Sequence, residues 1–298
     1  MTDIYILGAG AMGCLWATYF NDPTRYRVTF IVRSPSQWAT VPHHIHCTPH
    51  NSITPVRITH VDDVQEIQHL VVATKAPESL AGVRALSARL APNAQIMLLQ
   101  NGMGSQQAIA QAFAQHAIYA CSSTEGVYKT QLNQLVHAGQ GENHIGGLTT
   151  LAKQPTLQQW LPARLFEWHE DIDTVLWRKL VINAAINPLT VLYQCRNGAL
   201  LDHPQAHLHM KQLCTELDSL LHAKGLPITH TLALAEQVCQ RTAQNYSSMY
   251  KDAEAGRPTE IDFINGFVVS QATQLGLTCP THEQVINRIK MQTPSRQS

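Results

Sequence analysis

A glycine motif close to the start of the chain limits the fold more than any other feature. The segment Gly8-Ala9-Gly10-Ala11-Met12-Gly13 fits the pattern G-x-G-x-x-G. An apolar run at 3–7 precedes it and predicts a buried strand, and residues 12–20 have the apolar spacing of a helix. In such a strand–turn–helix unit the glycines permit a tight turn, the approach of a pyrophosphate and close helix–strand packing. The motif therefore predicts a dinucleotide site at the N-terminus of the first helix.

The rest of the first half repeats this alternation of strands and helices. Apolar runs predict strands at 28–32, 70–73, 95–99 and 118–122, and helices at 78–90 and 105–115. The alternation is typical of a parallel sheet with helices on both faces. Between 127 and 150, polar alternation with several glycines predicts antiparallel strands that close the sheet edge.

The second half has helical apolar spacing almost throughout. Gly or Pro residues separate the predicted helices, which are 171–192, 204–223, 229–250, 260–275 and 280–291. We therefore expect an α/β fold with a Rossmann domain at 1–170, followed by an all-α domain at 171–298. The polar tail at 293–298 is expected to be frayed.

Composition excludes several classes of partner. Lys plus Arg and Asp plus Glu are both 21, so bulk charge gives no reason to expect nucleic acid or an anionic membrane. No apolar run approaches the length of a membrane span. The seven scattered cysteines fit free thiols in the cytoplasm, and the histidine pairs lack partners at zinc-site spacing, so no metal is assigned.

The end of the second predicted strand bears on the choice of dinucleotide. An NAD site favours an acidic residue there, but residues 31–35 contain none and instead include Arg33. A guanidinium can bind a 2′-phosphate through two hydrogen bonds, so we expect NADP(H). Lys75, after the strand at 70–73, is a second candidate for this phosphate. Either residue could instead be a solvated surface cation.

A polar stripe marks the first helix of the second half. Lys179, Asn183 and Asn187 are four residues apart and fall on one helix face among apolar neighbours. The stripe predicts a ligand-binding surface or a hydrogen-bonded seam between helices. Pro188 is expected to break or kink this helix.

Further polar residues recur later in the helical half. Asn197 begins an Asn-Gly turn, and Asn245 and Ser248 are predicted on one helix face. Glu260 opens a predicted helix, where Thr259 and Asp262 resemble a capping box. An acidic residue at this position also simply favours the helix dipole.

Taken together, these motifs resemble the ketopantoate reductase (2-dehydropantoate 2-reductase) family. The resemblance covers most of the chain and rests on LGAGAMG at 7–13, Arg33, TKA at 74–76, QNGMG at 100–104, WRKLVINAAINPLT at 177–190, NG at 197–198, NYSSM at 245–249 and TEID at 259–262. It implies a helical domain like that of 6-phosphogluconate dehydrogenases, with the active site in the cleft between the domains. It also implies NADPH-dependent reduction of 2-dehydropantoate to (R)-pantoate in pantothenate and coenzyme A synthesis.

The resemblance assigns roles residue by residue. Lys179 would give a proton to the ketone oxygen, and Glu260 would contact substrate and cofactor. The substrate would be held by Asn183, Asn187, Asn197, Asn245 and Ser248. Asn101 would lie near both ligands, and the cofactor would further contact Gly8 to Gly13, Arg33, Lys75 and Gly126. A positioned ammonium suits this chemistry, because hydride attack builds negative charge on the ketone oxygen.

Three alternatives remain. A reductase of the same fold could act on another 2-oxo acid, and a non-catalytic NADPH-binding regulator could share the motifs. A 6-phosphogluconate-type dehydrogenase would need more cations than the amide-rich stripe supplies. The sequence leaves open whether the chain forms a homodimer.

Overall fold

The chain folds into two compact units. The computed structural model describes residues 1–292, so the tail expected to be frayed lies outside the described residues. Unit 1 comprises Met1–Gln100 and Ser105–Ile172, and unit 2 comprises Asn101–Gly104 and the chain from Asp173 onward. A single boundary near residue 170 therefore omits one feature, because the short segment at 101–104 belongs with the helical unit.

The main sheet of unit 1 has the strand order of a dinucleotide-binding domain. Its order within the described residues is β12-β11-β8-β7-β6-β1-β2-β5, and all neighbours are parallel except β11 and β8. The order from β5 to β8 is the doubly wound arrangement of the Rossmann fold. The bounds are β1 (Thr2–Leu7), β2 (Tyr26–Ile31), β5 (Arg57–Thr59), β6 (Ile67–Val72), β7 (Leu90–Leu98), β8 (Ala117–Ser123), β11 (Asn143–Gly147) and β12 (Glu167–Trp168).

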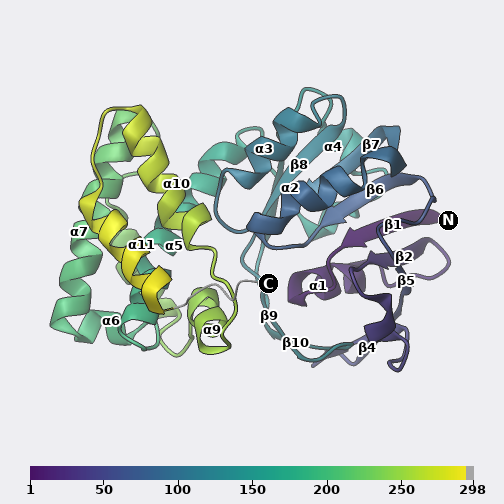
Figure 1. Cartoon of the computed structure of the whole chain (residues 1–298), viewed down its shortest axis with the longest axis horizontal. Coiled ribbons are helices and arrows are strands. Elements are labelled where there is room, and N and C mark those ends of the chain that lie inside the picture. The colour runs from purple at the N-terminus through teal and green to yellow at the C-terminus, as the bar shows by residue number, and fades with distance from the viewer. Residues whose placement is uncertain (293–298) are drawn as a thin grey trace. The chain divides into compact units, whose positions relative to one another are not determined.

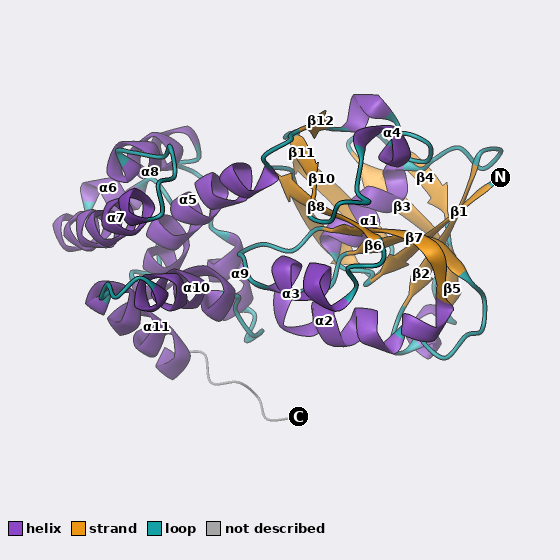
Figure 2. Cartoon of the chain, turned by 90° about the horizontal axis from the view of Figure 1, so that it is seen from above, coloured by secondary structure: helices purple, strands orange, loops and turns teal. Residues whose placement is uncertain are grey.

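Helices cover both faces of this sheet because side chains along each strand alternate. Ile4 and Ile6 face the core that contains α1 (Ala11–Tyr19), whereas Tyr5 and Leu7 face the core that contains α2 (Ala76–Ala85) and α3 (Ser105–Ala112). Figure 2 shows α2 and α3 side by side on their face of the strands. A short helix, α4 (Gln154–Leu157), completes the unit.

A second, four-stranded sheet covers the outer side of α1. Its order is β4-β3-β10-β9, and α1 contacts all four strands (Figure 1). The bounds are β3 (His44–Thr48), β4 (Ser52–Pro55), β9 (Gly126–Gln131) and β10 (Gln134–Gly139). The expected closure of the main sheet by strands from 127–150 is therefore correct only for β11, because β9 and β10 belong to this second sheet.

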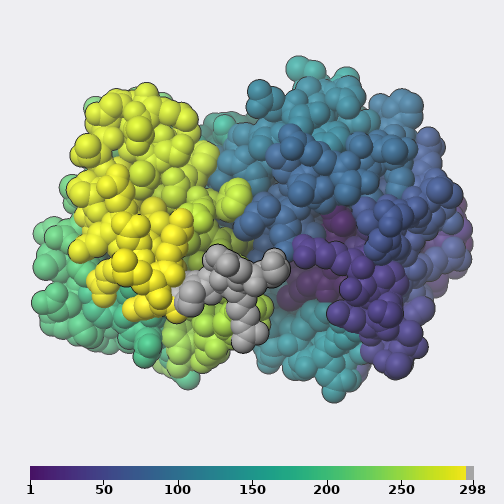
Figure 3. Space-filling model, in the orientation of Figure 1, coloured from purple at the N-terminus to yellow at the C-terminus, as the bar shows by residue number. Residues whose placement is uncertain are grey.

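Unit 2 is helical. Its elements are α5 (Ile172–Leu192), α6 (Ala199–Asp202), α7 (Pro204–Ala223), α8 (Thr231–Arg241), α9 (Ser248–Glu254), α10 (Ile261–Gln274) and α11 (Pro280–Gln292). In the view of Figure 3, α10 and α11, coloured yellow-green to yellow, form much of the visible face of this unit. The single helix expected at 229–250 is wrong, because a turn and an extended segment separate α8 from α9.

Pro188 does not break α5, so the first of the two expected effects, a break or a kink, is wrong. The helix continues through it to Leu192. A proline lacks the N–H that would bond the carbonyl four residues earlier, here that of Ala184. The buried Asn265 side chain donates to this carbonyl instead, with 3.0 Å between Nδ2 and the oxygen. A side chain from α10 thus replaces the missing hydrogen bond.

The length and apolar character of α5 bear on the expectation that no apolar run approaches the length of a membrane span. Within residues 1–292, α5 is the one helix long and apolar enough to cross a membrane. However, 72% of the apolar 18-residue stretch within α5 is buried inside the structure. This burial is what the core helix of a globular unit shows, so the length of α5 is weak support for a membrane span.

Candidate functional site

The glycine loop after β1 has the geometry that a dinucleotide requires. Gly8 has a φ of +99°, which favours glycine. A β-carbon on Gly13 would lie 2.1 Å from the Gly8 carbonyl oxygen, so a side chain cannot fit there. A β-carbon on Gly10 would meet nothing within 4 Å. Gly10 is the N-cap of α1, so open space adjoins the helix end whose N–H groups attract phosphate.

The sheet order brings the two cationic residues that are candidates for binding a 2′-phosphate to this edge. β1 lies between β2 and β6, so Gly8, Arg33 and Lys75 all follow the carboxyl ends of neighbouring parallel strands. Lys75 is the N-cap of α2. The Arg33 side chain is 78% exposed, and its guanidinium lies 2.6 Å from the Glu78 carboxylate. Gly126, the first residue of β9, lies in the second sheet.

Three side chains that sequence reasoning missed stabilise the glycine loop and the neighbouring strand ends. Lys129 of β9 donates to the Ala9 carbonyl over 2.8 Å, which places an ammonium beside the glycine loop. Gln100 donates to the Val72 and Thr74 carbonyls, and Gln106 donates to the Gln100 carbonyl. A lone lysine in a polar hairpin carries no signal that would have identified it.

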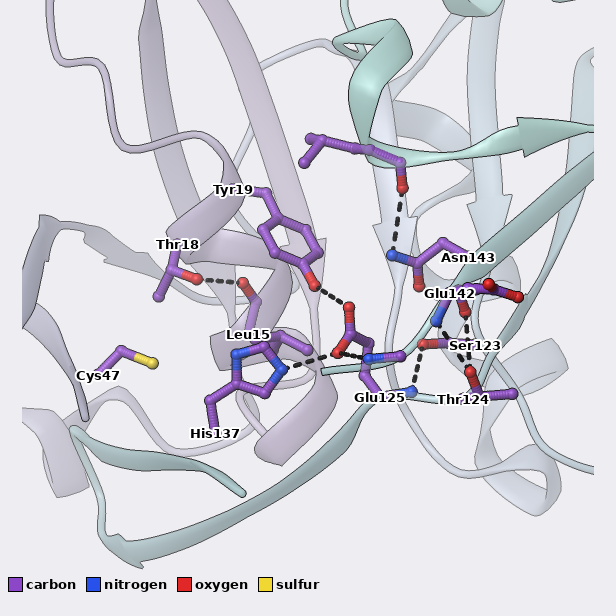
Figure 4. Close-up of polar contacts among 12 residues, drawn as sticks. Leu15, Thr18, Tyr19, Cys47, Ser123, Thr124, Glu125, His137, Glu142 and Asn143 are labelled. Carbon is purple, nitrogen blue, oxygen red and sulfur yellow. Dashed lines mark hydrogen bonds and ion pairs between the residues drawn. The ribbon is translucent and has the colours of Figure 1, made fainter. Parts of the chain in front are cut away.

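Glu125 connects α1 to the second sheet (Figure 4). Its carboxylate accepts from the Tyr19 hydroxyl at 2.7 Å and the Gly141 amide at 2.8 Å, and lies 2.7 Å from His137 Nε2. Burial alone would raise the pKa of Glu125, but these hydrogen bonds outweigh it and hold the pKa below its ordinary value. The network fixes the helix whose N-terminus faces the glycine loop.

A cavity of about 520 Å³ lies beside this network in unit 1. Its wall includes Tyr19, Glu125, His137 and Asn143. None of the residues predicted to bind substrate or cofactor lines it, so this cavity is distinct from the glycine loop.

In unit 2, the predicted residue Asn101 lies within hydrogen-bond reach of two others, Lys179 and Glu260. Lys179 Nζ donates to Asn101 Oδ1 over 2.9 Å, and Asn101 Nδ2 lies 3.5 Å from Glu260 Oε2. Glu260 is 9% exposed, and Lys179 is half-buried. Glu260 is the N-cap of α10, so Thr259 does not take the N-cap position that the expected capping box of Thr259 and Asp262 requires. The Glu260 side chain makes no capping hydrogen bond. An ammonium, an amide and a carboxylate thus converge although the sequence separates them widely.

Backbone contacts to α10 hold Asn101 in this group. Met103 N donates to the Phe263 carbonyl over 2.8 Å. Gly102 has a φ of +75°, and a β-carbon there would lie 2.3 Å from the same carbonyl. The QNGMG motif therefore needs its first glycine to bring the loop against α10.

The structure places the remaining predicted residues at different depths in unit 2. Asn183 is half-buried and Asn187 is 8% exposed, both on α5 with Lys179. Asn197, in the expected turn, donates to Thr242 Oγ1, and its buried Oδ1 has no partner among the described residues. Asn245 precedes α9 and Ser248 begins it, so the prediction that both lie on one helix face is wrong.

Ser247 has a role that the sequence did not indicate. Its hydroxyl accepts from the Tyr250 amide as the N-cap of α9, and it lies 2.7 Å from the Thr190 hydroxyl of α5. The neighbouring Ser248 is exposed. The buried cap therefore orients the exposed serine and Asn245 relative to α5.

The chain matches one protein family over most of its length. Residues 4–149 match the family model described as ketopantoate reductase PanE/ApbA, and residues 171–293 match its C-terminal counterpart. The 2-dehydropantoate 2-reductase of Vibrio cholerae is 31% identical over 97% of both chains. That of Listeria innocua is 27% identical over 97% of this chain and 96% of its own.

Solved structures share the same fold. A probable 2-dehydropantoate 2-reductase from Bacillus subtilis is 26% identical, with a TM-score of 0.82 over 98% of this chain and all of its own. A D-mandelate dehydrogenase solved with NADH has a TM-score of 0.86 over 99% of both chains, but its 18% identity shows the fold alone. From these matches, which cover both units, the chain belongs to the ketopantoate reductase family.

Proposed function

We propose that this protein reduces 2-dehydropantoate to (R)-pantoate, with Lys179 as proton donor. The observation that carries the proposal is the hydrogen-bonded group of Lys179, Asn101 and Glu260. Membership of the family whose curated relatives bear this activity in their names supports the substrate. The free thiols of all seven cysteines, which fall within the described residues, support a reducing compartment, the cytoplasm.

The residues of unit 1 fit a bound nicotinamide dinucleotide. The open space at Gly10 and the N-terminus of α1 can accept its pyrophosphate. Arg33 and Lys75 would hold a 2′-phosphate, which favours NADPH, and Lys129 adds positive charge beside the loop. When bound, NADPH supplies the hydride that reduces the C2 ketone.

The residues of unit 2 provide the other half of the reaction. The Lys179 ammonium stabilises the negative charge that develops on the ketone oxygen and delivers the proton that completes the hydroxyl. Asn101 accepts a hydrogen bond from this ammonium and orients it. Glu260, next to Asn101, would contact substrate and cofactor, as the family resemblance implies. Asn183, Asn187, Asn197, Asn245 and Ser248 hold the substrate's hydroxyl and carboxylate. The unpartnered Oδ1 of Asn197 supports this role, since a substrate hydroxyl could donate to it.

The test follows NADPH absorbance with 2-dehydropantoate. Lys179→Ala should lower kcat by about 10²–10⁴-fold while NADPH binding persists. Lys211→Ala, at an exposed lysine of α7, is the matched control and should leave kcat unchanged. A wild-type protein that binds NADPH tightly but turns over no 2-dehydropantoate would overturn the substrate. Activity on other 2-oxo acids would then identify a sister reductase, and no turnover at all a regulator.

The cofactor assignment has its own test. Arg33→Ala should lower kcat/KM for NADPH by about 10–100-fold, the range for losing a hydrogen bond to a charged group. The same substitution should barely change kcat/KM for NADH, which has no 2′-phosphate. Equal losses with both cofactors would show that Arg33 acts on the loop and not on the phosphate.

A further inference from the structure

Two histidines and a glutamate of unit 1 form a compact group outside the proposed active site. His144 lies on β11, Glu167 on β12 and His169 just after β12. His144 Nδ1 lies 2.9 Å from His169 Nε2, and Glu167 oxygens lie 3.5 Å from each of these nitrogens. Among residues 1–292, this is the one group of three or more such side chains whose candidate ligand atoms lie within 4.8 Å of one another.

The backbone fixes the positions of these side chains. His144 and Glu167 are register partners in the parallel pair β11–β12, and the His169 amide donates to the Ile145 carbonyl over 2.8 Å. The side chains of His144 and His169 are 20% and 26% exposed, while that of Glu167 is 67% exposed. The imidazoles are therefore held in place, and solvent reaches the group from the side of Glu167.

A second carboxylate prepares His144 to bind a cation. Glu142 Oε2 lies 3.3 Å from His144 Nε2. This is an ion-pair contact with an exposed carboxylate, which favours a proton on Nε2 and leaves the lone pair of Nδ1 directed toward His169 and Glu167. Histidines that bind metals usually donate their other ring N–H to such a carboxylate.

We propose that His144, His169 and Glu167 bind a first-row divalent cation of the zinc class, with Glu142 orienting His144. Zinc bonds of about 2.0–2.1 Å in tetrahedral geometry separate ligand atoms by about 3.3 Å. The observed separations of 2.9 and 3.5 Å lie on either side of that value. Two imidazoles and one carboxylate suit zinc better than magnesium or calcium, which prefer oxygen ligands.

The cation would strengthen the edge of the main sheet. β12 has only two residues and pairs only with β11 in that sheet. A metal bound by residues of β11, of β12 and of the segment after β12 would tie this edge to the strand beside it. Residue spacing does not indicate this site, because His144 and His169 are 25 positions apart. The proposal is independent of the reductase activity.

The test is zinc titration of the chelator-treated, full-length protein by calorimetry. The wild type should bind one Zn²⁺ per chain at this site, and His144→Ala/His169→Ala should lose that binding. Glu142→Ala should weaken it by about 10–100-fold. Added Zn²⁺ should raise the Tm of the wild type and not that of the double variant. Co²⁺ should give a visible ligand-field spectrum only where both histidines are present.

Two further variants keep the test decisive. His43→Ala/His222→Ala also removes two imidazoles, both from exposed residues, and should keep the zinc site. If the double variant at His144 and His169 does not fold, Glu167→Ala replaces it, since that exposed side chain can be removed without disturbing the core. A wild type that binds no more zinc than the double variant would overturn the proposal and leave a hydrogen bond between two histidines.

Discussion

Gly8, Gly10 and Gly13 lie within a few residues of one another, yet each lacks a side chain for a different reason. Gly8 needs its positive φ, and Gly13 must pass against the carbonyl of Gly8. Gly10 has no such constraint within the fold, because its missing β-carbon faces open space. The fold therefore requires the first and third glycines, and we propose that the second is a glycine because of the ligand.

Alanine substitutions should separate these roles. Gly13→Ala should lower the free energy of unfolding, because its β-carbon would overlap the Gly8 oxygen unless the loop shifts. Gly10→Ala should leave the free energy of unfolding within about 0.5 kcal/mol of the wild-type value but should weaken NADPH binding. Urea unfolding and NADPH titration of both variants measure this. Destabilisation by Gly10→Ala as large as that by Gly13→Ala would contradict the assignment.

At the residue scale, site residues were predictable where they are close together in the sequence. The stripe of Lys179, Asn183 and Asn187 was predictable because four-residue steps return to one helix face. The contact between Asn101 and Lys179 spans 78 positions, and spacing carries no information about it. Only the family resemblance placed both residues near the substrate.

At the scale of elements, α5 shows how a helix can continue through a proline. The lost N–H of Pro188 would leave the Ala184 carbonyl unsatisfied in a buried region. Asn265 of α10 supplies the donor, and the same amide nitrogen lies 2.9 Å from His282 Nδ1 on α11. The continuity of α5 thus depends on another helix.

A double-mutant cycle should measure this dependence. Asn265→Ala should lower the free energy of unfolding by about 1–3 kcal/mol, because it leaves a buried carbonyl without a hydrogen-bond donor. In a Pro188→Ala background, the new N–H can donate to the Ala184 carbonyl. The destabilisation caused by Asn265→Ala should therefore be about 1 kcal/mol smaller. Leu176→Ala, about 12 Å along the helix from Ala184, is the control and should be additive with Asn265→Ala. An unchanged cost in the Pro188→Ala background would show that Asn265 does not replace the helical bond.

Most elements with strong periodicity were predictable, and the exceptions have a physical cause. The helix at 204–223 was predicted with its observed bounds, because its apolar face repeats regularly. The short strands β3, β4 and β5 were missed, since three to five residues show too little alternation. The break between α8 and α9 contains no Pro or Gly to mark it, so the apolar spacing predicts one continuous helix there.

At the scale of the whole molecule, the order of strands and helices along the chain was predictable. Which unit each segment belongs to was not fully predictable. The alternation in the first half predicts a parallel sheet with helices on both faces, and the periodicity of the second half predicts helices. The segment at 101–104 belongs with unit 2 because backbone contacts to Phe263 hold it there. These long-range contacts leave no trace in local sequence patterns.

The helical unit also contains a buried histidine at a junction of four helices. His282 of α11 is fully buried, and its Nδ1 lies beside the Asn265 amide of α10. Its Nε2 lies 3.3 Å from the Leu213 carbonyl of α7, and Asn265 also reaches α5. Desolvation lowers the pKa of His282 to about 4, although the nearby Glu216 carboxylate opposes this shift. His282 is therefore neutral in the native protein at neutral pH.

This histidine should make global stability depend on pH. The unfolded chain takes up a proton at His282 near its ordinary pKa of about 6.5, whereas the native protein does not do so until about 4. The stability from the neutral form is thus fully present above about 6.5 and is lost as pH falls toward 4. The loss approaches 1.4 kcal/mol per pH unit and about 3 kcal/mol in total.

His282→Gln is the test, because glutamine can still accept from Asn265 and donate to Leu213 but does not titrate. Urea unfolding at several pH values between 4 and 8 should give a shallower loss of stability for the variant than for wild type. Carboxylates and the other histidines contribute equally to both proteins, so the difference between the two curves isolates His282. Parallel curves would show that His282 is protonated as readily in the fold as in the unfolded chain. The hydrogen bond from Asn265 to Nδ1 would then not be the native arrangement.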